Sequence, residues 1–334
     1  MTVPRMASRS SLAALLLLTP LALAGCRSAG AAAATAQPTT FPTSACSGQA
    51  ASGNFTVSVP SGDVHRTVLV HLPSGFSDRA RDALVLNMHG SGSTAQQQAR
   101  FSGMDAVADR DGFIVAYPQG AIPSGSGYDW NVPGQPLFGG GAVPANAPDD
   151  VAFLATVISS LQADLCIDAS RVYATGFSGG ARMASQLGCD LSGVVAAIAP
   201  VSGLRLPAPC PSTRPVAVLT FHGTADPVDP YDGNGQKYWT YSVPVAAQRW
   251  AAHDGCNATP VQTEPATSAE LTAYSGCAGG AAVALYTIVG EGHEWPGGPT
   301  LPAVDTDVLG PQSNAVSAAS LMWQFFSAHP LPPS

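Results

Sequence analysis

The residues with the clearest chemical potential lie in one short segment, residues 176–180 (GFSGG), which follows the apolar run 171–175. A Gly-x-Ser-x-Gly pattern between a strand and a helix places the serine on a sharp turn, where its hydroxyl points away from the sheet toward substrate. Glycines are needed there because the turn is strained and neighbouring backbone passes close to the serine. An isolated serine hydroxyl is a weak nucleophile. If Ser178 attacks a substrate, the chain must therefore also supply a base and an acid that orients the base.

Two later residues have the types and positions needed for that base and acid. Asp226 follows the apolar run 216–221, and His293 lies on a glycine-flanked loop after the run 283–289. The order serine, aspartate, histidine is that of α/β-hydrolase triads. In this interpretation His293 takes the proton of Ser178, while Asp226 fixes the tautomer of His293 and stabilises its charged form.

Each of these residues also has a simpler interpretation. Asp226 alone could be a turn residue before a proline, and His293 alone could be a surface histidine. Asp229 is the alternative acid. The joint case is stronger, because all three residues of the proposed triad follow predicted strands in the right order.

An ester carbonyl that becomes an oxyanion needs backbone N–H donors. Gly179, which follows the candidate nucleophile, is expected to supply one donor. The loop MHGSG after an earlier strand is expected to supply the other, from Gly90 or Ser91. His89 and His222 each precede a glycine at a strand end, and we expect them to be structural.

Motifs for metals and phosphates fail on inspection. The run EGHE at 291–294 is not a zincin helix, because Gly297 stands where a second histidine is needed. The run GSGS at 90–93 lacks the lysine of a phosphate-binding loop. We expect neither a metal nor a cofactor.

The elements that must position these residues follow from the hydrophobic pattern. Apolar β-type runs alternate with helical stretches, which predicts an α/β fold with a mostly parallel sheet and helices on both faces. Active sites in such sheets lie at the carboxyl ends of the strands. No insertion between 201 and 216 is long enough for a large lid. Strands are expected at 67–72, 83–89, 113–118, 171–175, 194–200, 216–221 and 283–289, and helices at 151–165 (capped by Asp149 or Asp150), from 179 onward and at 315–326.

The N-terminus reads as a targeting segment. Residues 1–25 combine two arginines with a short apolar stretch and end in LAG before Cys26, the pattern of a bacterial lipoprotein signal peptide. Lipid on Cys26 would tether the protein to the outer face of the cell membrane, and residues 26–45 would form a flexible tether. An ordinary signal peptide, cleaved near Ala34 to secrete the protein, is the alternative. Residues 46–334 are expected to form one catalytic domain.

Seven cysteines are an odd number for an exported protein. If lipid occupies Cys26, six remain, which suggests three disulfides outside the cytoplasm. Fifteen pairings are possible. The pairs we expect are Cys256–Cys277, Cys189–Cys210 and Cys46–Cys166, and free buried thiols are the alternative.

Composition limits the partners. The chain has 334 residues, 46% of them hydrophobic and 11% charged, so it can bury a substantial core. Its formal net charge is −8, and Lys237 is its single lysine. An acidic chain without a basic run argues against nucleic acid as a partner. We expect a monomer whose partners are an ester substrate and, through the anchor, a membrane.

Several motifs together resemble the polyhydroxybutyrate depolymerase and feruloyl esterase-like family of secreted serine esterases, in its lipoprotein branch. The resemblance covers about residues 46–328 and implies an α/β-hydrolase fold with Ser178, Asp226 and His293 as nucleophile, acid and base. Depolymerases of this kind that act on solid polyester carry a separate binding domain, which is not seen here. The matching motifs are MHG at 88–90, DDV at 149–151, GFSGG at 176–180, HGTAD at 222–226 with PY at 230–231, and GHEWPG at 292–297.

The sequence predicts the type of reaction more closely than the acyl group of the substrate. An aromatic shelf of Trp295, Trp130, Tyr231 and Trp239 would suit an aromatic or sugar-linked ester or a polyester, although each ring could instead fill the core. The expected activity is hydrolysis of acetyl, hydroxycinnamoyl or short hydroxyalkanoate esters. A cell-envelope acyltransferase that uses the same triad is one alternative. A non-catalytic surface binding lipoprotein on a hydrolase scaffold is another, although an intact triad argues against it.

Overall fold

A mixed β-sheet with an apolar centre forms the framework of the chain. The computed structural model describes residues 52–76, 81–235, 238–299 and 306–332, and in these ranges ten strands join in one sheet. In chain order the strands are β1 (Gly53–Ser61), β2 (Val64–Leu72), β3 (Asp82–Met88), β4 (Phe113–Pro118), β7 (Ile167–Phe177), β8 (Ala197–Val201), β9 (Ala217–Gly223), β10 (Val261–Ala266), β11 (Ala269–Tyr274) and β12 (Val283–Ile288). All residues of β4, β8 and β9 are buried, as expected for strands covered on both faces.

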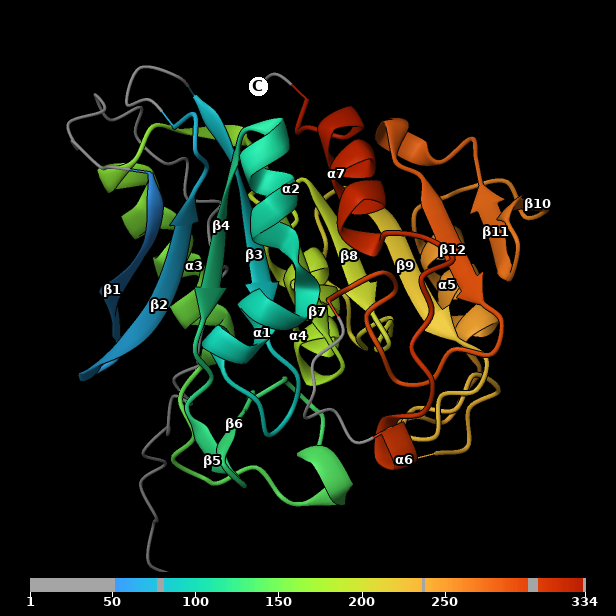
Figure 1. Ribbon diagram of the computed structural model, residues 1–334, viewed down its shortest axis with the longest axis horizontal. Helices are drawn as coiled ribbons and strands as arrows, with labels where there is room; N and C mark the ends of the chain where they lie inside the picture. Colours follow the sequence, from blue (N-terminus) through green and yellow to red (C-terminus); the bar gives the residue numbers. More distant parts are fainter. Residues whose placement is uncertain (1–51, 77–80, 236–237, 300–305, 333–334) are drawn as a thin grey trace, which may run out of the picture. The chain divides into compact units, whose positions relative to one another are not determined.

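The order of strands in the sheet is β1-β2-β4-β3-β7-β8-β9-β12-β11-β10 (Figure 1). The six central strands from β4 to β12 are parallel, and β2 and β11 join them in the antiparallel direction. The predicted mostly parallel sheet is therefore confirmed. The carboxyl ends of β3, β7, β9 and β12 meet at one edge of the sheet, which brings distant parts of the sequence together.

Helices cover both faces of the sheet (Figure 1). One face packs against the first, second and last helices, and the other face packs against the helices at residues 150–164, 179–190 and 243–253. The helices are α1 (Ala95–Ser102), α2 (Met104–Asp111), α3 (Asp150–Asp164), α4 (Gly179–Asp190), α5 (Val243–His253), α6 (Thr306–Leu309) and α7 (Ala318–Ala328). Asp149 caps α3 by accepting a hydrogen bond from the backbone of Ala152, so the first of the two expected caps is used.

Each face of the sheet has its own apolar core. Phe153, Met183 and Trp250, from three different helices, belong to the core on one face. Met104 and Phe326 belong to the core on the other face. The sheet is therefore fixed from both sides, which limits movement of the loops at its carboxyl edge.

Disulfides join segments outside the central strands. Cys189–Cys210 and Cys256–Cys277 are present, as expected from the sequence. Cys166 is also disulfide-bonded, but its expected partner Cys46 lies outside the described residues.

The described residues belong to one compact unit, Thr40–Ser334. None of the helices that they form is long and apolar enough to span a bilayer. The expected signal peptide, the expected anchor at Cys26 and the whole of the expected tether, residues 26–45, lie outside the described residues.

Candidate active site

Ser178 lies on a sharp turn between β7 and α4. Its backbone has φ 52° and ψ −113°, a strained conformation for a residue with a side chain. The turn is held on the strand side, where the N–H of Ser178 donates to the carbonyl of Val201 in β8. On the helix side, the N–H of Arg182 donates to the carbonyl of Ser178. These hydrogen bonds to the sheet and to the helix therefore stabilise the strained backbone conformation of Ser178.

The glycines of this turn are required because neighbouring backbone leaves no room for a Cβ. A Cβ on Gly176 would lie 2.6 Å from the carbonyl carbon of Gly180 and 2.8 Å from the carbonyl oxygen of Met88. A Cβ on Gly180 would lie 2.6 Å from the carbonyl oxygen of His89. The end of β3 thus packs directly on the turn, which explains why the motif needs both glycines.

Asp226 and His293 are joined by a short hydrogen bond. The Nδ1 of His293 lies 2.7 Å from Oδ2 of Asp226, and both side chains are buried. The other oxygen, Oδ1, accepts from the backbone N–H groups of Val228 and Asp229, each at 2.8 Å. Because the carboxylate accepts, Nδ1 of a neutral His293 carries the proton and Nε2 is left as the basic nitrogen.

The electrostatics of this pair favour a charged state for both groups. Burial alone would raise the pKa of Asp226, but attraction to His293 and hydrogen bonds from His222 and His293 outweigh it and hold the pKa below its ordinary range. Burial alone would lower the pKa of His293, but the charge and hydrogen bond of Asp226 outweigh it and raise the pKa. An imidazolium formed during a reaction would therefore be stabilised in place.

Two further polar residues surround this pair. The Nε2 of His222 lies 3.1 Å from Oδ2 of Asp226 and 2.8 Å from the carbonyl oxygen of Asp229, so His222 helps to hold the loop after β9. Asp229, the alternative acid, faces Arg182 at 3.5 Å rather than His293. Asp226 is thus the carboxylate that orients His293.

The loop of His293 is held by a later part of the chain. Residues 309–313, which we call the strap, run beside it. The N–H of His293 donates to the carbonyl of Leu309 at 2.5 Å, and that of Gly292 donates to the carbonyl of Pro311 at 2.7 Å. The backbone position of His293 therefore depends on the strap.

Backbone donors for an oxyanion lie beside Ser178. Gly179 begins α4, and the N of Ser91 lies 3.2 Å from the point where a Cβ on Gly179 would be. Within the described ranges, the N–H groups of Gly90, Ser91 and Gly179 donate to no other group. An oxyanion hole requires two such amides on neighbouring segments.

His89 fixes the shape of this loop. Its Nε2 accepts the N–H of Gly120 at 2.9 Å, so its Nδ1 carries the proton and donates to the carbonyl of Gly90 at 2.8 Å. Burial lowers the pKa of His89 to about 4, which keeps the ring neutral. The expected structural role of His89 agrees with these contacts.

Ser178 and His293 line one cavity of about 720 Å³. Most of the residues that line this cavity could not be predicted from the sequence. Gln97 and Gln98 could have been suspected, because they directly follow the loop of Gly90 and Ser91, but Phe138 and Val308 carry no sequence signal. Besides those already named, the lining residues are Gly92, Ser93, Phe101, Ser126, Phe177, Val228 and Leu309.

The four aromatic residues expected to form a shelf do not line this cavity. Trp130, Trp239 and Trp295 are at most 3% exposed, so the expectation of an exposed shelf is wrong for them. The indole N–H of Trp130 supports the oxyanion loop by donating to the carbonyl of His89. Tyr231 is half-buried and its hydroxyl contacts Thr287. These rings pack the walls behind the site.

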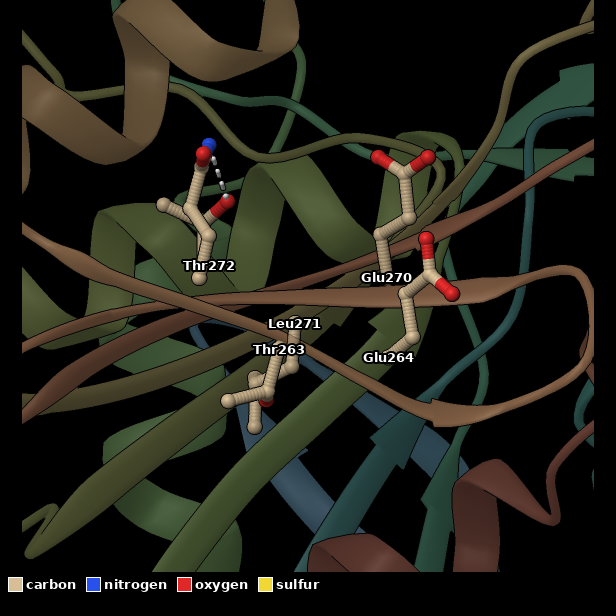
Figure 2. A pocket seen from close by; sticks show the side chains of 6 residues that line it. Thr263, Glu264, Glu270, Leu271 and Thr272 are labelled. Atoms are coloured by element: carbon tan, nitrogen blue, oxygen red, sulfur yellow. Dashed lines mark hydrogen bonds between the residues drawn. The ribbon is translucent and has the colours of Figure 1, made fainter.

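A second hollow, of about 540 Å³, lies on the hairpin of β10 and β11 (Figure 2). Glu264 and Glu270 are directed to the same side, and the amide of Gln262 contacts Thr272. The other residues of its lining are Gln262, Thr263, Leu271 and Thr272, without a histidine, cysteine or serine. Within the described part of the chain, no group of His, Cys, Asp or Glu side chains could hold a metal ion.

The sheet, the turn at Ser178 and the Asp226–His293 pair define the class of protein as an α/β-hydrolase. The family model described as "Esterase PHB depolymerase" matches residues 67–240. The chain belongs to this esterase family, whose members are carboxylic-ester hydrolases.

Individual relatives agree with this assignment. Feruloyl esterase B of Piromyces equi is 34% identical over 244 residues, which are 68% of this chain and 42% of that protein. The probable feruloyl esterase C of Aspergillus clavatus is 26% identical over 282 residues, 81% of this chain and 88% of that protein. The solved acetyl xylan esterase from Aspergillus awamori has the same fold, with a TM-score of 0.52 at 17% identity over 77% of this chain and 99% of that protein.

Proposed function

We propose that this protein is a serine esterase that hydrolyses carboxylic esters through an acyl-enzyme on Ser178. The observation that carries the proposal is the 2.7 Å bond between Asp226 and His293, with His293 and Ser178 lining one cavity. A binding protein would not need an oriented histidine beside a strained serine. The family assignment supports the same reaction.

The reaction follows from the positions of these groups. His293 Nε2 takes the proton of Ser178 as its Oγ attacks the ester carbonyl. The N–H groups of Gly179 and Ser91 stabilise the oxyanion. His293 then gives the proton to the departing alcohol, and water attacks the acyl-enzyme by the reverse sequence to release the acid.

The acyl groups that we propose are hydroxycinnamoyl and acetyl groups carried on polysaccharides. The names of curated relatives support this class, and so do Phe101, Phe138 and Phe177, which give the cavity an aromatic wall. The disulfides agree with a location outside the cytoplasm.

A fluorophosphonate probe and an ester panel test this function. The wild type should label at Ser178 and hydrolyse feruloyl, acetyl, butyryl or hydroxybutyrate-oligomer esters, and Ser178→Ala should do neither. Equal labelling of Ser178→Ala would disprove the nucleophile. Adding sugar acceptors to the assay separates hydrolysis from acyl transfer, because a transferase would yield new sugar esters in place of free acid.

A further inference from the structure

Gln98 on α1 is a polar residue of the cavity that the proposed reaction does not use. It is 1% exposed, yet it lines the same cavity as Ser178 and His293. Its Nε2 donates to Oδ1 of Asn87 at 2.8 Å. In the described part of the chain, no group donates to its Oε1. A buried amide oxygen in a cavity wall retains hydrogen-bonding capacity that a ligand can use.

The orientation of this amide is set by a chain of hydrogen bonds that ends at a carboxylate. Asn87 Nδ2 donates to Ser102 Oγ at 3.0 Å. The hydroxyl of Ser102 is hydrogen-bonded to Tyr117, whose own hydroxyl donates to Oδ1 of Asp105 at 2.6 Å. Burial and the charge of Asp105 raise the pKa of Tyr117 well above its ordinary value, so Tyr117 keeps its proton.

In this series of hydrogen bonds, the donor and the acceptor of each bond are then fixed. Tyr117 donates to the carboxylate of Asp105, so its oxygen accepts from Ser102. The oxygen of Ser102 is then left to accept from the Nδ2 of Asn87. Asn87 must offer its carbonyl oxygen to Gln98, so the Nε2 of Gln98 is used inside the protein. An amide turned the other way would place two donors against each other and leave a buried bond unmade.

We propose that Gln98 determines specificity by accepting a hydrogen bond at Oε1 from a hydroxyl group of the ester substrate. This inference rests on the proposed esterase function. The oriented amide offers an oxygen to the cavity, so it selects a hydroxyl donor over a hydrogen or a methyl ether at the same position. A site that pairs with a hydroxyl rejects the analogue that lacks it, because its own polar group is then left unpaired.

The neighbouring Gln97 provides a matched control. It lines the same cavity, but its Oε1 already accepts from the hydroxyls of Ser93 and Thr94 at 3.1 and 3.2 Å. Gln97→Met and Gln98→Met make the same chemical change on adjacent residues. Gln98→Met removes an amide oxygen that is available to substrate, whereas Gln97→Met removes one that already accepts hydrogen bonds within the protein.

The experiment compares kcat/KM for three pairs of esters that differ in a hydroxyl. The pairs are methyl 4-hydroxycinnamate with methyl cinnamate, methyl 3-hydroxybutyrate with methyl butyrate, and 2-hydroxycyclohexyl acetate with cyclohexyl acetate. In at least one pair the wild type should favour the hydroxylated ester by roughly five- to tenfold, the worth of one hydrogen bond. Gln98→Met should bring that ratio to about one, and Gln97→Met should leave it unchanged. The pair whose ratio changes in Gln98→Met shows whether the recognised hydroxyl lies on the acyl group or on the alcohol group of the ester.

A second variant tests the chain of bonds itself. Tyr117 does not line the cavity, but Tyr117→Phe frees the amides of Asn87 and Gln98 to rotate. The kcat/KM ratio between the hydroxylated and the plain ester of the same pair should therefore move toward one.

The rate of fluorophosphonate labelling at Ser178 shows whether each variant keeps an intact site. A hydroxyl preference that persists in a normally labelled Gln98→Met overturns the proposal, as does a wild type that labels but shows no preference in any pair. If Gln98→Met does not fold, an unchanged ratio in Tyr117→Phe overturns it. A wild type that neither labels nor hydrolyses any ester overturns the proposed function as well.

Discussion

At the scale of single residues, the main feature of the site is the number of donors around Asp226. Two backbone N–H groups and two histidines, His222 and His293, contact its carboxylate. A carboxylate fixed in this way holds the ring of His293 in one tautomer and one orientation. The neighbouring Asp229 is also fully buried but pairs with Arg182.

Substitution of the two aspartates should therefore separate their roles. Asp226→Asn should lower kcat by roughly 10³–10⁴-fold, because an amide cannot favour the proton on Nδ1 of His293. Asp229→Asn should retain far more activity, since it removes a contact to Arg182. Steady-state kinetics on a chromogenic acetyl ester measure both variants. The assignment of the acid fails if Asp229→Asn loses more activity than Asp226→Asn.

The raised pKa of His293 predicts the acid side of the pH profile. The base must be neutral, so kcat/KM should fall as pH decreases through a pKa above 6.5, the ordinary value for histidine. Burial raises the pKa of the adjacent Glu294 to about 7, so that this carboxyl ionises in the same range. Glu294→Gln separates the two groups: the acid limb should persist if it reports His293. A limb that disappears in Glu294→Gln would assign it to the carboxyl instead.

At the scale of elements, the site depends on the close packing of β3 against the turn between β7 and α4. The glycines of that turn occupy space that the carbonyl groups of Met88 and His89 leave free. The backbone nitrogen of Ser91 lies close to Gly179, 3.2 Å from the point where a Cβ on Gly179 would be. The proposed nucleophile and the proposed oxyanion donors thus lie at one packing contact.

A single methyl group at this contact should disrupt the site. Gly180→Ala would place its Cβ against the backbone of Met88 and His89, which cannot move without displacing β3. We expect a lower melting temperature and loss of fluorophosphonate labelling. Gly193→Ala is the matched control, because a Cβ at Gly193 meets nothing within 4 Å. Normal labelling of Gly180→Ala would show that the contact is looser than described.

The central elements could be predicted from the sequence, whereas several others could not. Buried strands such as Phe113–Pro118 are continuous apolar runs, and this pattern identifies them directly. Strands β1 and β10 alternate or expose their residues at the edges of the sheet, and α1 is rich in glutamine, so none of them has a strong apolar pattern. The cavity wall was missed for a related reason. Phe138, in a short 3-10 helix, and Val308, in α6, reach the site through tertiary packing of segments distant in the sequence, which local sequence does not encode.

At the scale of the whole molecule, the membrane-anchored location that we propose rests on residues outside the described structure. The sequence before Cys26 has the features of a lipoprotein signal peptide, and the disulfides are consistent with export. An anchored enzyme would act on esters that reach the cell surface. Its catalytic unit would not need to enter the bilayer.

Replacement of Cys26 tests the anchor. Cys26→Ser removes the thiol that would carry the lipid, so the protein should move from the membrane fraction to the medium with unchanged esterase activity. Ser28→Ala, two residues away, should stay in the membrane fraction. Fractionation followed by activity measurement distinguishes the two. Equal membrane retention of both variants would rule out a lipid on Cys26.

The strap of residues 309–313 has a consequence for the order in which the protein becomes active. During synthesis, Ser178 emerges long before His293, and His293 emerges before Leu309 and Pro311, whose carbonyls hold its loop. The proposed nucleophile and the proposed oxyanion donors can thus be in place while the proposed base is still unsupported. A nascent chain should remain without hydrolytic activity until the strap has folded back beside the loop of His293, so the appearance of esterase activity would report that the strap is in place.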